Sequence, residues 1–179
     1  MKFESASLSG VVIVKPRIFT DDRGWFAETF NQSELQNNGL PRCFVQDNQS
    51  FSHAGVLRGL HYQLGKPQGK LVRVLSGEIY DVAVDLRRES PTFGQWIGLR
   101  LSASSLEMIW IPENFAHGFL VLSESAHVLY KVTDFYEPSA ERTLRWDDPT
   151  LGIDWPIIGS PILSAKDAAG SMLQGADLP

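Results

Sequence analysis

The chain contains a single cysteine, Cys43. One cysteine rules out an intrachain disulfide and a zinc site built from paired cysteines, and it is typical of a protein that works in a reducing cytoplasm. Long hydrophobic runs are also missing, because Lys15 and Arg17 interrupt the short apolar run at residues 11–14. The sequence therefore predicts neither a signal peptide nor a transmembrane helix.

Positive charge is scarce, with 16 Lys and Arg against 21 Asp and Glu and a formal net charge of -5. Binding to a phosphate backbone needs a basic stripe, so we expect no nucleic-acid partner and no membrane contact. Repeats, low-complexity segments and linkers are absent as well, and 43% hydrophobic residues suit a sizeable core. Residues 1–179 are predicted to form a single domain.

Short segments rich in β-branched and aromatic residues recur along the chain, separated by turn signals such as Ser76-Gly77 and Ser90-Pro91. Many short strands at this spacing predict a mainly β protein, an antiparallel sandwich or barrel. The predicted strands are Val11–Ile18, Trp25–Phe30, Cys43–Ser50, Val56–Gln63, Leu71–Leu75, Glu78–Leu86, Gln95–Leu101, Leu106–Ile111, Gly118–Leu122, His127–Thr133 and Arg142–Trp146.

Two short helices are also predicted. The first spans Ser33–Asn38, with Gly39 as its C-terminal cap residue and Pro41 preventing continuation. The second begins near Ser164. In the strand at residues 79–86, alternation places four apolar side chains on one face and Asp81 with Asp85 on the other, so one face should pack and the other could line a cavity.

The segment Arg58-Gly59-Leu60-His61-Tyr62-Gln63, followed by Lys70, combines two cations with an imidazole in a region that otherwise reads as sheet. Histidine accepts a proton near neutral pH, and a neighbouring lysine stabilises negative charge on a substrate oxygen. The cluster indicates proton abstraction next to a carbonyl. For any one of these residues alone, a half-exposed strand with surface cations and a hydrogen-bonded histidine is the better explanation, and only the combination favours a site.

Arg58 and His61 are three residues apart, so an ideal strand would point them to opposite faces. A bulge at Gly59 could re-aim one of them.

Residues 112–119 resemble the second motif of cupins, Pro-x-Gly-x-x-His, with Asn114 where glycine is usual and His117 as the histidine. The first cupin motif supplies a His-x-His pair in metal-dependent members, but here it reads His61-Tyr62-Gln63. Two imidazoles and a carboxylate on one wall form the usual facial metal site. We therefore expect neither a metal nor any other cofactor.

Further motifs occur in a fixed order along nearly the whole chain. They are Asp22-Arg23-Gly24-x-Phe26-x-Glu28, Gln46-Asp47-Asn48, Arg58 to Gln63, Gln68-Gly69-Lys70, Pro112 to Phe119, Tyr130-Lys131 and Ser164-x-Lys166-Asp167. In these motifs the chain resembles the dTDP-4-dehydrorhamnose 3,5-epimerase family. This resemblance implies a metal-free cupin jelly-roll barrel, a homodimer, and an isomerase that inverts C3 and C5 of dTDP-4-dehydro-6-deoxy-D-glucose on the route to dTDP-L-rhamnose.

The resemblance also implies catalytic roles. His61 would be the base, Asp167 its partner, Lys70 the cation facing the C4 oxygen and Tyr130 the proton donor on the opposite sugar face. Asp167 also fits a helix-capping pattern with Ser164, and Tyr130 could be a packed aromatic.

By the same resemblance, other residues would hold the nucleotide and the diphosphate. The arginines suit bidentate contacts to phosphate, Tyr136 would stack on thymine, and the stretch from Arg23 to Glu28 is a candidate to cross a dimer interface. His53 and His127 match no functional position. The substrate-binding set is Arg23, Phe26, Glu28, Gln46, Asp47, Asn48, Arg58, His117, Tyr136, Glu141 and Lys166.

Three other functions compete with this interpretation. An epimerase acting on only C3 or only C5 of a related ketosugar would share most of the site. A sugar-binding cupin without catalysis would have no reason to keep His61, Lys70, Tyr130 and Asp167 together. A metal-dependent cupin would need the missing second histidine.

Overall fold

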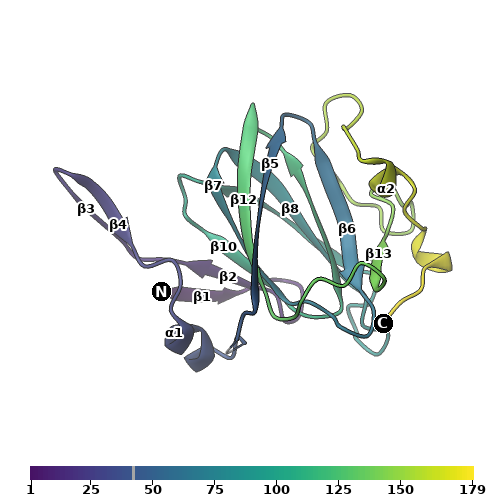
Figure 1. Cartoon of the computed structure of the whole chain (residues 1–179), viewed down its shortest axis with the longest axis horizontal. Helices are drawn as coiled ribbons and strands as arrows, with labels where there is room; N and C mark the ends of the chain where they lie inside the picture. The colour runs from purple at the N-terminus through teal and green to yellow at the C-terminus, as the bar shows by residue number, and fades with distance from the viewer. Residues whose placement is uncertain (42) are drawn as a thin grey trace.

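The computed structural model describes residues 1–41 and 43–179, and all but two of its strands form two antiparallel sheets that face each other (Figure 1). The first sheet has the order β1 (Lys2–Ser5), β2 (Val12–Lys15), β10 (Met108–Ile111), β7 (Lys70–Ser76), β12 (Ser125–Val132) and β5 (Gln46–His53). The second has the order β13 (Glu141–Thr143), β6 (Leu57–Gln63), β11 (Phe115–Val121), β8 (Glu78–Asp85) and β9 (Trp96–Ser102). Most neighbours are distant in sequence, as in a jelly roll, which confirms the predicted fold class.

A hairpin of β3 (Ile18–Asp21) and β4 (Gly24–Ala27) projects away from the barrel, and we call it the arm (Figure 1). The sequence predicted one strand over Val11–Ile18, but β2 ends at Lys15 and β3 starts at Ile18. Pro16 lies between them and has no backbone N–H to donate to a sheet, which explains the interruption.

The two predicted helices are present, each close to its expected position. Helix α1 spans Gln32–Asn37, with the Asn31 side chain accepting bonds from two backbone N–H groups and Gly39 in the left-handed region at φ 77°. Asn38, one residue before Gly39, is the C-cap residue. Helix α2 spans Ala165–Ala168 and a 3-10 turn covers Leu173–Gly175. Among the described residues, no helix is long and apolar enough to cross a membrane.

The core divides into three apolar clusters. The first fills the space between the sheets and includes Val72, Ile79 and Val128. The second lies between the outer face of the second sheet and the C-terminal segment, where Trp155 and Leu173 cover it. The third packs α1 against the first sheet. Both faces of the second sheet are thus covered.

Strand β8 therefore has two buried faces, which differs from the expectation that one would line a cavity. Val82 and Val84 pack under the C-terminal segment, and Ile79 and Ala83 pack between the sheets. Asp81 and Asp85 share this inner face and are fully buried. Buried carboxylates need hydrogen-bond partners. Asp81 bonds to His117, and Asp85 bonds to Arg87 and its loop.

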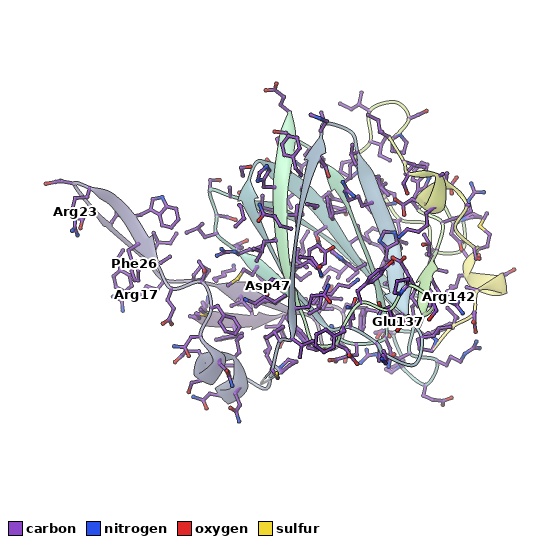
Figure 2. All side chains as sticks on the ribbon, in the orientation of Figure 1. Arg17, Arg23, Phe26, Asp47, Glu137 and Arg142 are labelled. Carbon is purple, nitrogen blue, oxygen red and sulfur yellow. The ribbon has the colours of Figure 1, made fainter. Side chains whose placement is uncertain are left out.

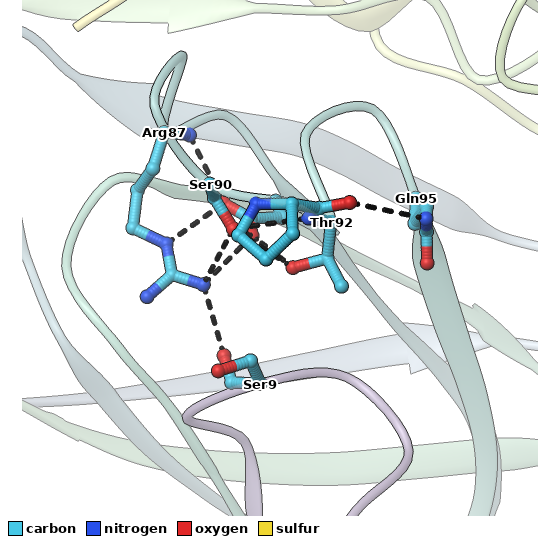
Figure 3. Close-up of polar contacts among 7 residues, drawn as sticks. Ser9, Arg87, Ser90, Thr92 and Gln95 are labelled. Atoms are coloured by element: carbon cyan, nitrogen blue, oxygen red, sulfur yellow. Dashed lines mark hydrogen bonds and ion pairs between the residues drawn. The ribbon is translucent and has the colours of Figure 1, made fainter.

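Asp85 holds together the loop that follows β8, and Figure 3 shows the loop residues Arg87, Ser90 and Thr92 that bond to it. Its carboxylate accepts bonds from the Arg87 guanidinium at 2.7 and 2.8 Å, from Ser90 Oγ at 2.7 Å and from Thr92 Oγ1 at 2.6 Å. Arg87 also donates to the Ser9 carbonyl oxygen at 3.0 Å and lies over the ring of Phe115. Although burial raises the pKa of Asp85, these hydrogen bonds outweigh it and lower the pKa.

Candidate active site

A cavity of about 320 Å³ opens between the two sheets. Its walls carry the side chains of Arg58, Lys70 and Lys166, while Glu141 is the one carboxylate on the walls among the described residues. This excess of positive charge suits an anionic ligand. The predicted site residues that line the cavity are Gln46, Asn48, Arg58, His61, Lys70, His117, Tyr130, Tyr136, Glu141 and Lys166.

Strand β6 brings Arg58 and His61 to the same cavity despite their spacing. The pairing between β11 and β6 shifts between His117, which faces His61, and Phe119, which faces Arg58. Two residues of β6 thus oppose one of β11, which is a bulge at Gly59, as predicted. A Cβ at Gly59 would lie 2.6 Å from the Gly118 Cα, so no larger residue fits.

His61 and Asp167 form a hydrogen-bonded pair, with His61 Nε2 2.5 Å from Asp167 Oδ1. Asp167 reaches His61 from α2, where its backbone N–H also donates to Ser164 Oγ at 3.1 Å. Ser164 is thus the helix cap, which leaves the Asp167 carboxylate for the imidazole. Asp167 therefore has both roles that the sequence allowed, because its backbone joins the helix cap and its carboxylate pairs with His61.

The protonation of this pair follows from its burial. Burial lowers the pKa of His61, although Asp167 opposes the shift, so the imidazole is neutral at pH 7. Burial raises the pKa of Asp167, but the hydrogen bond from His61 and the positive charge that His61 carries at acidic pH outweigh it and lower the pKa. The ionised carboxylate accepts a hydrogen bond from the Nε2–H of His61, which leaves the lone pair on Nδ1 free to act as a base.

Lys70 lies at the start of β7 and is buried, with 7% of its surface exposed. Its Nζ donates to the His61 carbonyl oxygen at 3.3 Å, so the side chain spans the interior from one sheet to the other. Burial lowers its pKa to about 8, which leaves it mostly protonated at pH 7. A cation is thus held beside the histidine.

Tyr130 projects into the cavity from β12, in the sheet that faces His61. Burial raises the pKa of its hydroxyl, so it keeps its proton at neutral pH. A ligand between the sheets would therefore have an imidazole on one side and a phenol on the other.

His117 is held by a second carboxylate. Its Nε2 lies 2.8 Å from Asp81 Oδ2, and both residues are buried. The other oxygen of Asp81 is buried without a hydrogen-bond partner among the described residues. The sequence placed Asp81 on the face of its strand opposite the four apolar residues but did not pair it with His117.

Glu141 joins two walls of the cavity. Its carboxylate accepts bonds from Lys166 Nζ and from the Tyr136 hydroxyl, both at 2.8 Å. The backbone N–H of Tyr136 donates to Gln46 Oε1 at 3.1 Å. Burial raises the pKa of Glu141, but the bonds from Lys166 and Tyr136 outweigh it and lower the pKa, so the residue is ionised.

Four predicted binding residues do not line the cavity of this chain. Arg23, Phe26 and Glu28 lie on the arm or just after it, and Arg23 pairs with Asp21 at the arm's tip (Figure 2). Asp47 points to the outer face of β5, where it pairs with Lys131 at 2.9 Å. Alternation along β5 explains this, because Gln46 and Asn48 face inward.

Several cavity residues were not predicted, including Ser50, Gln63 and Gln68. The alternation from Gln46 through Asn48 could have identified Ser50. Gln63 holds two loops, since its Nε2 donates to the Lys66 and Phe135 carbonyl oxygens at 2.8 and 3.2 Å. That role depends on contacts between distant segments, which no local pattern reveals.

Across residues 1–41 and 43–179, no group of three or more His, Cys, Asp or Glu is placed to hold a metal ion.

The chain is similar to a set of known proteins. A family model described as dTDP-4-dehydrorhamnose 3,5-epimerase matches residues 5–175. A dTDP-4-dehydrorhamnose 3,5-epimerase of Pseudomonas aeruginosa is 55% identical over 99% of this chain and 98% of its own length. The crystal structure of a dTDP-6-deoxy-D-glucose-3,5-epimerase from Legionella pneumophila in complex with dTDP-4-keto-L-rhamnose has a TM-score of 0.96 at 48% identity, covering 99% of this chain and 97% of that one.

A more distant structure bears on the number of carbons inverted. A 3'-monoepimerase from Streptomyces bikiniensis, in complex with dTDP-quinovose, has a TM-score of 0.88 at 33% identity and covers 94% of this chain and 86% of that one. Double and single epimerases therefore share this fold.

Proposed function

This chain belongs to the dTDP-4-dehydrorhamnose 3,5-epimerase family, and we propose that its cavity converts dTDP-4-dehydro-6-deoxy-D-glucose to dTDP-4-dehydro-L-rhamnose with His61 as the base and Tyr130 as the acid. The chain is an isomerase of nucleotide sugars, of the kind that serves rhamnose biosynthesis. What supports the proposed roles is the arrangement of a neutral imidazole and a protonated phenol on facing sheets.

Each inversion begins with removal of a proton from a carbon next to the C4 ketone. His61 Nδ1 takes the proton from C3 or C5, and the electron pair of the C–H bond moves into an enolate on the C4 oxygen. The ionised Asp167 stabilises the imidazolium that forms, because its negative charge already accepts the hydrogen bond from the Nε2–H of His61.

Lys70 and Tyr130 complete the step. The protonated Lys70, buried beside His61, stabilises the enolate oxygen more strongly than a cation in water would. Tyr130 gives its proton to the carbon from the opposite side, which inverts the centre. The phenolate is reprotonated and the imidazolium deprotonated by solvent, so one proton from water enters each inverted carbon.

The nucleotide end of the substrate carries a diphosphate, and the cations of the cavity suit it. Arg58 is held in place by Ser52 Oγ, which accepts from its Nε at 2.9 Å, and by the Phe51 carbonyl oxygen, which accepts from a terminal nitrogen at 3.3 Å. This leaves the guanidinium with free donors for phosphate oxygens. Lys166 adds a charge, Tyr136 offers a face for the base, and Gln46, Asn48, His117 and Glu141 contribute polar contacts.

The test is to incubate the protein with dTDP-4-keto-6-deoxyglucose in deuterated water and to follow C3 and C5 by NMR. Deuterium at both carbons, unaffected by a chelator, is the expected result. His61→Ala should label neither carbon, whereas His53→Ala, which alters an exposed histidine outside the cavity, should behave as the wild type. Label at only one carbon would identify a single-centre epimerase, and loss of label with chelator would identify a metal enzyme.

A second copy of the chain is proposed to complete the site. The side chains of Phe19, Trp25 and Phe26 on the arm are 49%, 61% and 67% exposed, so about half or more of each is open to solvent in the single chain. Apolar surface of this extent on a projecting hairpin is typical of an interface. We expect the arm to reach a symmetric partner, where Arg23, Phe26 and Glu28 would contact the nucleotide.

A second cavity, at the base of the arm, supports the proposal that this side of the molecule belongs to the dimer interface. This cavity of about 120 Å³ is lined by Phe30, Asp47 and Arg73, and Arg73 Nε is buried without a hydrogen-bond partner among the described residues.

Two measurements test the proposed dimer. Light scattering should give the mass of a dimer. Arg23→Ala should raise KM and leave kcat unchanged, and an unchanged KM would contradict a role for the arm in binding.

We further propose that residues 1–179 act as one epimerase domain in the cytoplasm. Elements from both halves of the chain build the cavity, from Gln46 to Lys166. The single cysteine, Cys43, is free and exposed, which suits a reducing compartment.

A further inference from the structure

The backbone immediately before Lys70 is fixed by one residue, Thr133. The Gly69 N–H donates to Thr133 Oγ1 at 2.9 Å, and the Thr133 N–H donates to the Gly69 carbonyl oxygen at 3.1 Å. Both polar groups of the Gly69 backbone therefore bond to the same residue. The edge of the Trp110 ring closes the third side, since a Cβ at Gly69 would lie 2.2 Å from it.

The Thr133 hydroxyl is oriented by Glu113. It donates to Glu113 Oε1 at 2.8 Å, so its lone pairs are free to accept from the Gly69 N–H. Glu113 lies in the turn between β10 and β11, next to Asn114 in the left-handed region at φ 64°. The hydrogen bonds from Thr133 to Glu113 and from Gly69 to Thr133 thus tie the start of β7 to the ends of its neighbouring strands, β10 and β12.

A second side-chain hydrogen bond, from Gln68, holds the loop that leads into Gly69. Gln68 Nε2 donates to the Asp134 carbonyl oxygen at 2.8 Å, one residue beyond Thr133. Residues 68 and 69 are therefore tied to residues 133 and 134 by side-chain bonds that do not belong to the sheet ladder. The ladder itself begins only at Lys70, which pairs with Val132 and Ile111.

We propose that Thr133 and Glu113 are positioning residues that hold Lys70 against His61 in the proposed epimerase reaction, on which this inference rests. Neither side chain lines the cavity, so both act through Lys70. The Lys70 Nζ lies 3.3 Å from the His61 carbonyl oxygen, and a lysine is flexible enough to leave such a place if its backbone moves. A displacement of 1 Å in a catalytic group can reduce a rate by about 100-fold.

The first test compares Thr133→Val, which keeps the shape and removes the hydroxyl, with Thr133→Ser, which keeps the hydroxyl. Thr133→Val is expected to lower kcat by roughly 10-fold or more with little change in KM, and Thr133→Ser should restore most of the rate. Thr150→Val, in an exposed turn, is the matched control. A Thr133→Val enzyme with wild-type kcat, or a Thr133→Ser enzyme as impaired as Thr133→Val, would overturn the inference.

A second readout does not depend on activity. NMR titration of the Lys70 side chain should give a pKa of about 8 in the wild type. Burial and the charge of Lys166 on α2 lower this pKa, the charges of Asp81 on β8 and Glu141 on β13 raise it, and His61 on β6 lies beside the amine. In Thr133→Val the pKa should rise by roughly one unit or more, because a displaced lysine regains water. An unchanged titration would refute the inference even if kcat fell.

The two proposals fail in different ways. If the wild type exchanges no deuterium at C3 or C5, the epimerase function is wrong, and the Lys70 titration alone decides whether Thr133 positions that lysine. If Thr133→Val does not fold, Glu113→Ala carries the same expectation, because it frees the Thr133 hydroxyl to turn away from Gly69. Glu113→Gln, which retains an acceptor oxygen, should stay close to the wild type.

Discussion

Replacing Asp167 by Asn tests the histidine pair most directly. The substitution keeps the size of the side chain and the backbone N–H that donates to Ser164 Oγ, so α2 should remain folded. It removes the negative charge that lies 2.5 Å from His61 Nε2. The change therefore separates the partner role of Asp167 from its place in the helix.

The size of the effect follows from what the carboxylate does. Loss of a hydrogen bond to a charged group costs about 1.5–3 kcal/mol, or roughly 10- to 150-fold in rate. If the amide also donates to Nε2, the imidazole proton moves to Nδ1 and the base is lost, as in the serine-protease case where the equivalent change costs about 10⁴-fold. We expect kcat to fall on the order of 10²- to 10⁴-fold.

The dependence on pH provides an independent check. His61 must be neutral to accept a proton, and Asp167 raises its pKa while burial lowers it. Asp167→Asn removes the opposing contribution, so the pKa of His61 falls further and the acid limb of the kcat/KM profile moves to lower pH. Deuterium exchange at C3 and C5 measures both quantities, with Asp154→Asn, an exposed aspartate, as the control. A rate within about threefold of wild type, or an acid limb that stays in place, would refute the reasoning.

Three further predictions concern stability. Lys70→Met should abolish deuterium exchange yet stabilise the fold at pH 7 by on the order of 3 kcal/mol. The reason is that folding lowers the pKa of Lys70 from 10.5 to about 8, so burying the charged amine costs free energy. A lower melting temperature would contradict this. Gly59→Ala should lower the melting temperature by several degrees, because its Cβ meets the Gly118 backbone at 2.6 Å and φ is 109°. Asp85→Asn should destabilise the protein above pH 3.8, where the wild-type carboxylate is ionised in both the folded and the unfolded state. The difference in unfolding free energy between wild type and variant should shrink at lower pH, because the wild type loses this contribution there. Denaturation at several pH values measures the difference.

The sequence determined the fold class and most of the strands. Alternation and turn signals report local conformation, so strands such as Glu78–Leu86 were predicted to within one residue of β8. Boundaries were less accurate where tertiary pairing extends or shortens a strand. Strand β5 begins at Gln46 instead of Cys43 and continues to His53, because β12 pairs with it over that range. Strand β1 was missed, since four residues with mixed character show no pattern.

The residue types of the site were also present in the sequence. The spacing of His61, Lys70, Tyr130 and Asp167 in their motifs carried a resemblance that the family match supports, and His61, Lys70 and Tyr130 line one cavity with Asp167 bonded behind His61. Parity indicated that Arg58 and His61 would need an irregularity to share a face, Gly59 was the predicted place for a bulge, and the register shift lies there.

Only the tertiary structure decided which partner each of these groups has. Asp167 is 106 residues from His61, Asp81 is 36 from His117, and Thr133 is 64 from Gly69. A hydrogen bond depends on where folding brings two atoms, and the same is true of the burial that sets the pKa values of His61 and Lys70. The sequence by itself determined which chemical groups are available, and the packing of two sheets determined their partners and their protonation.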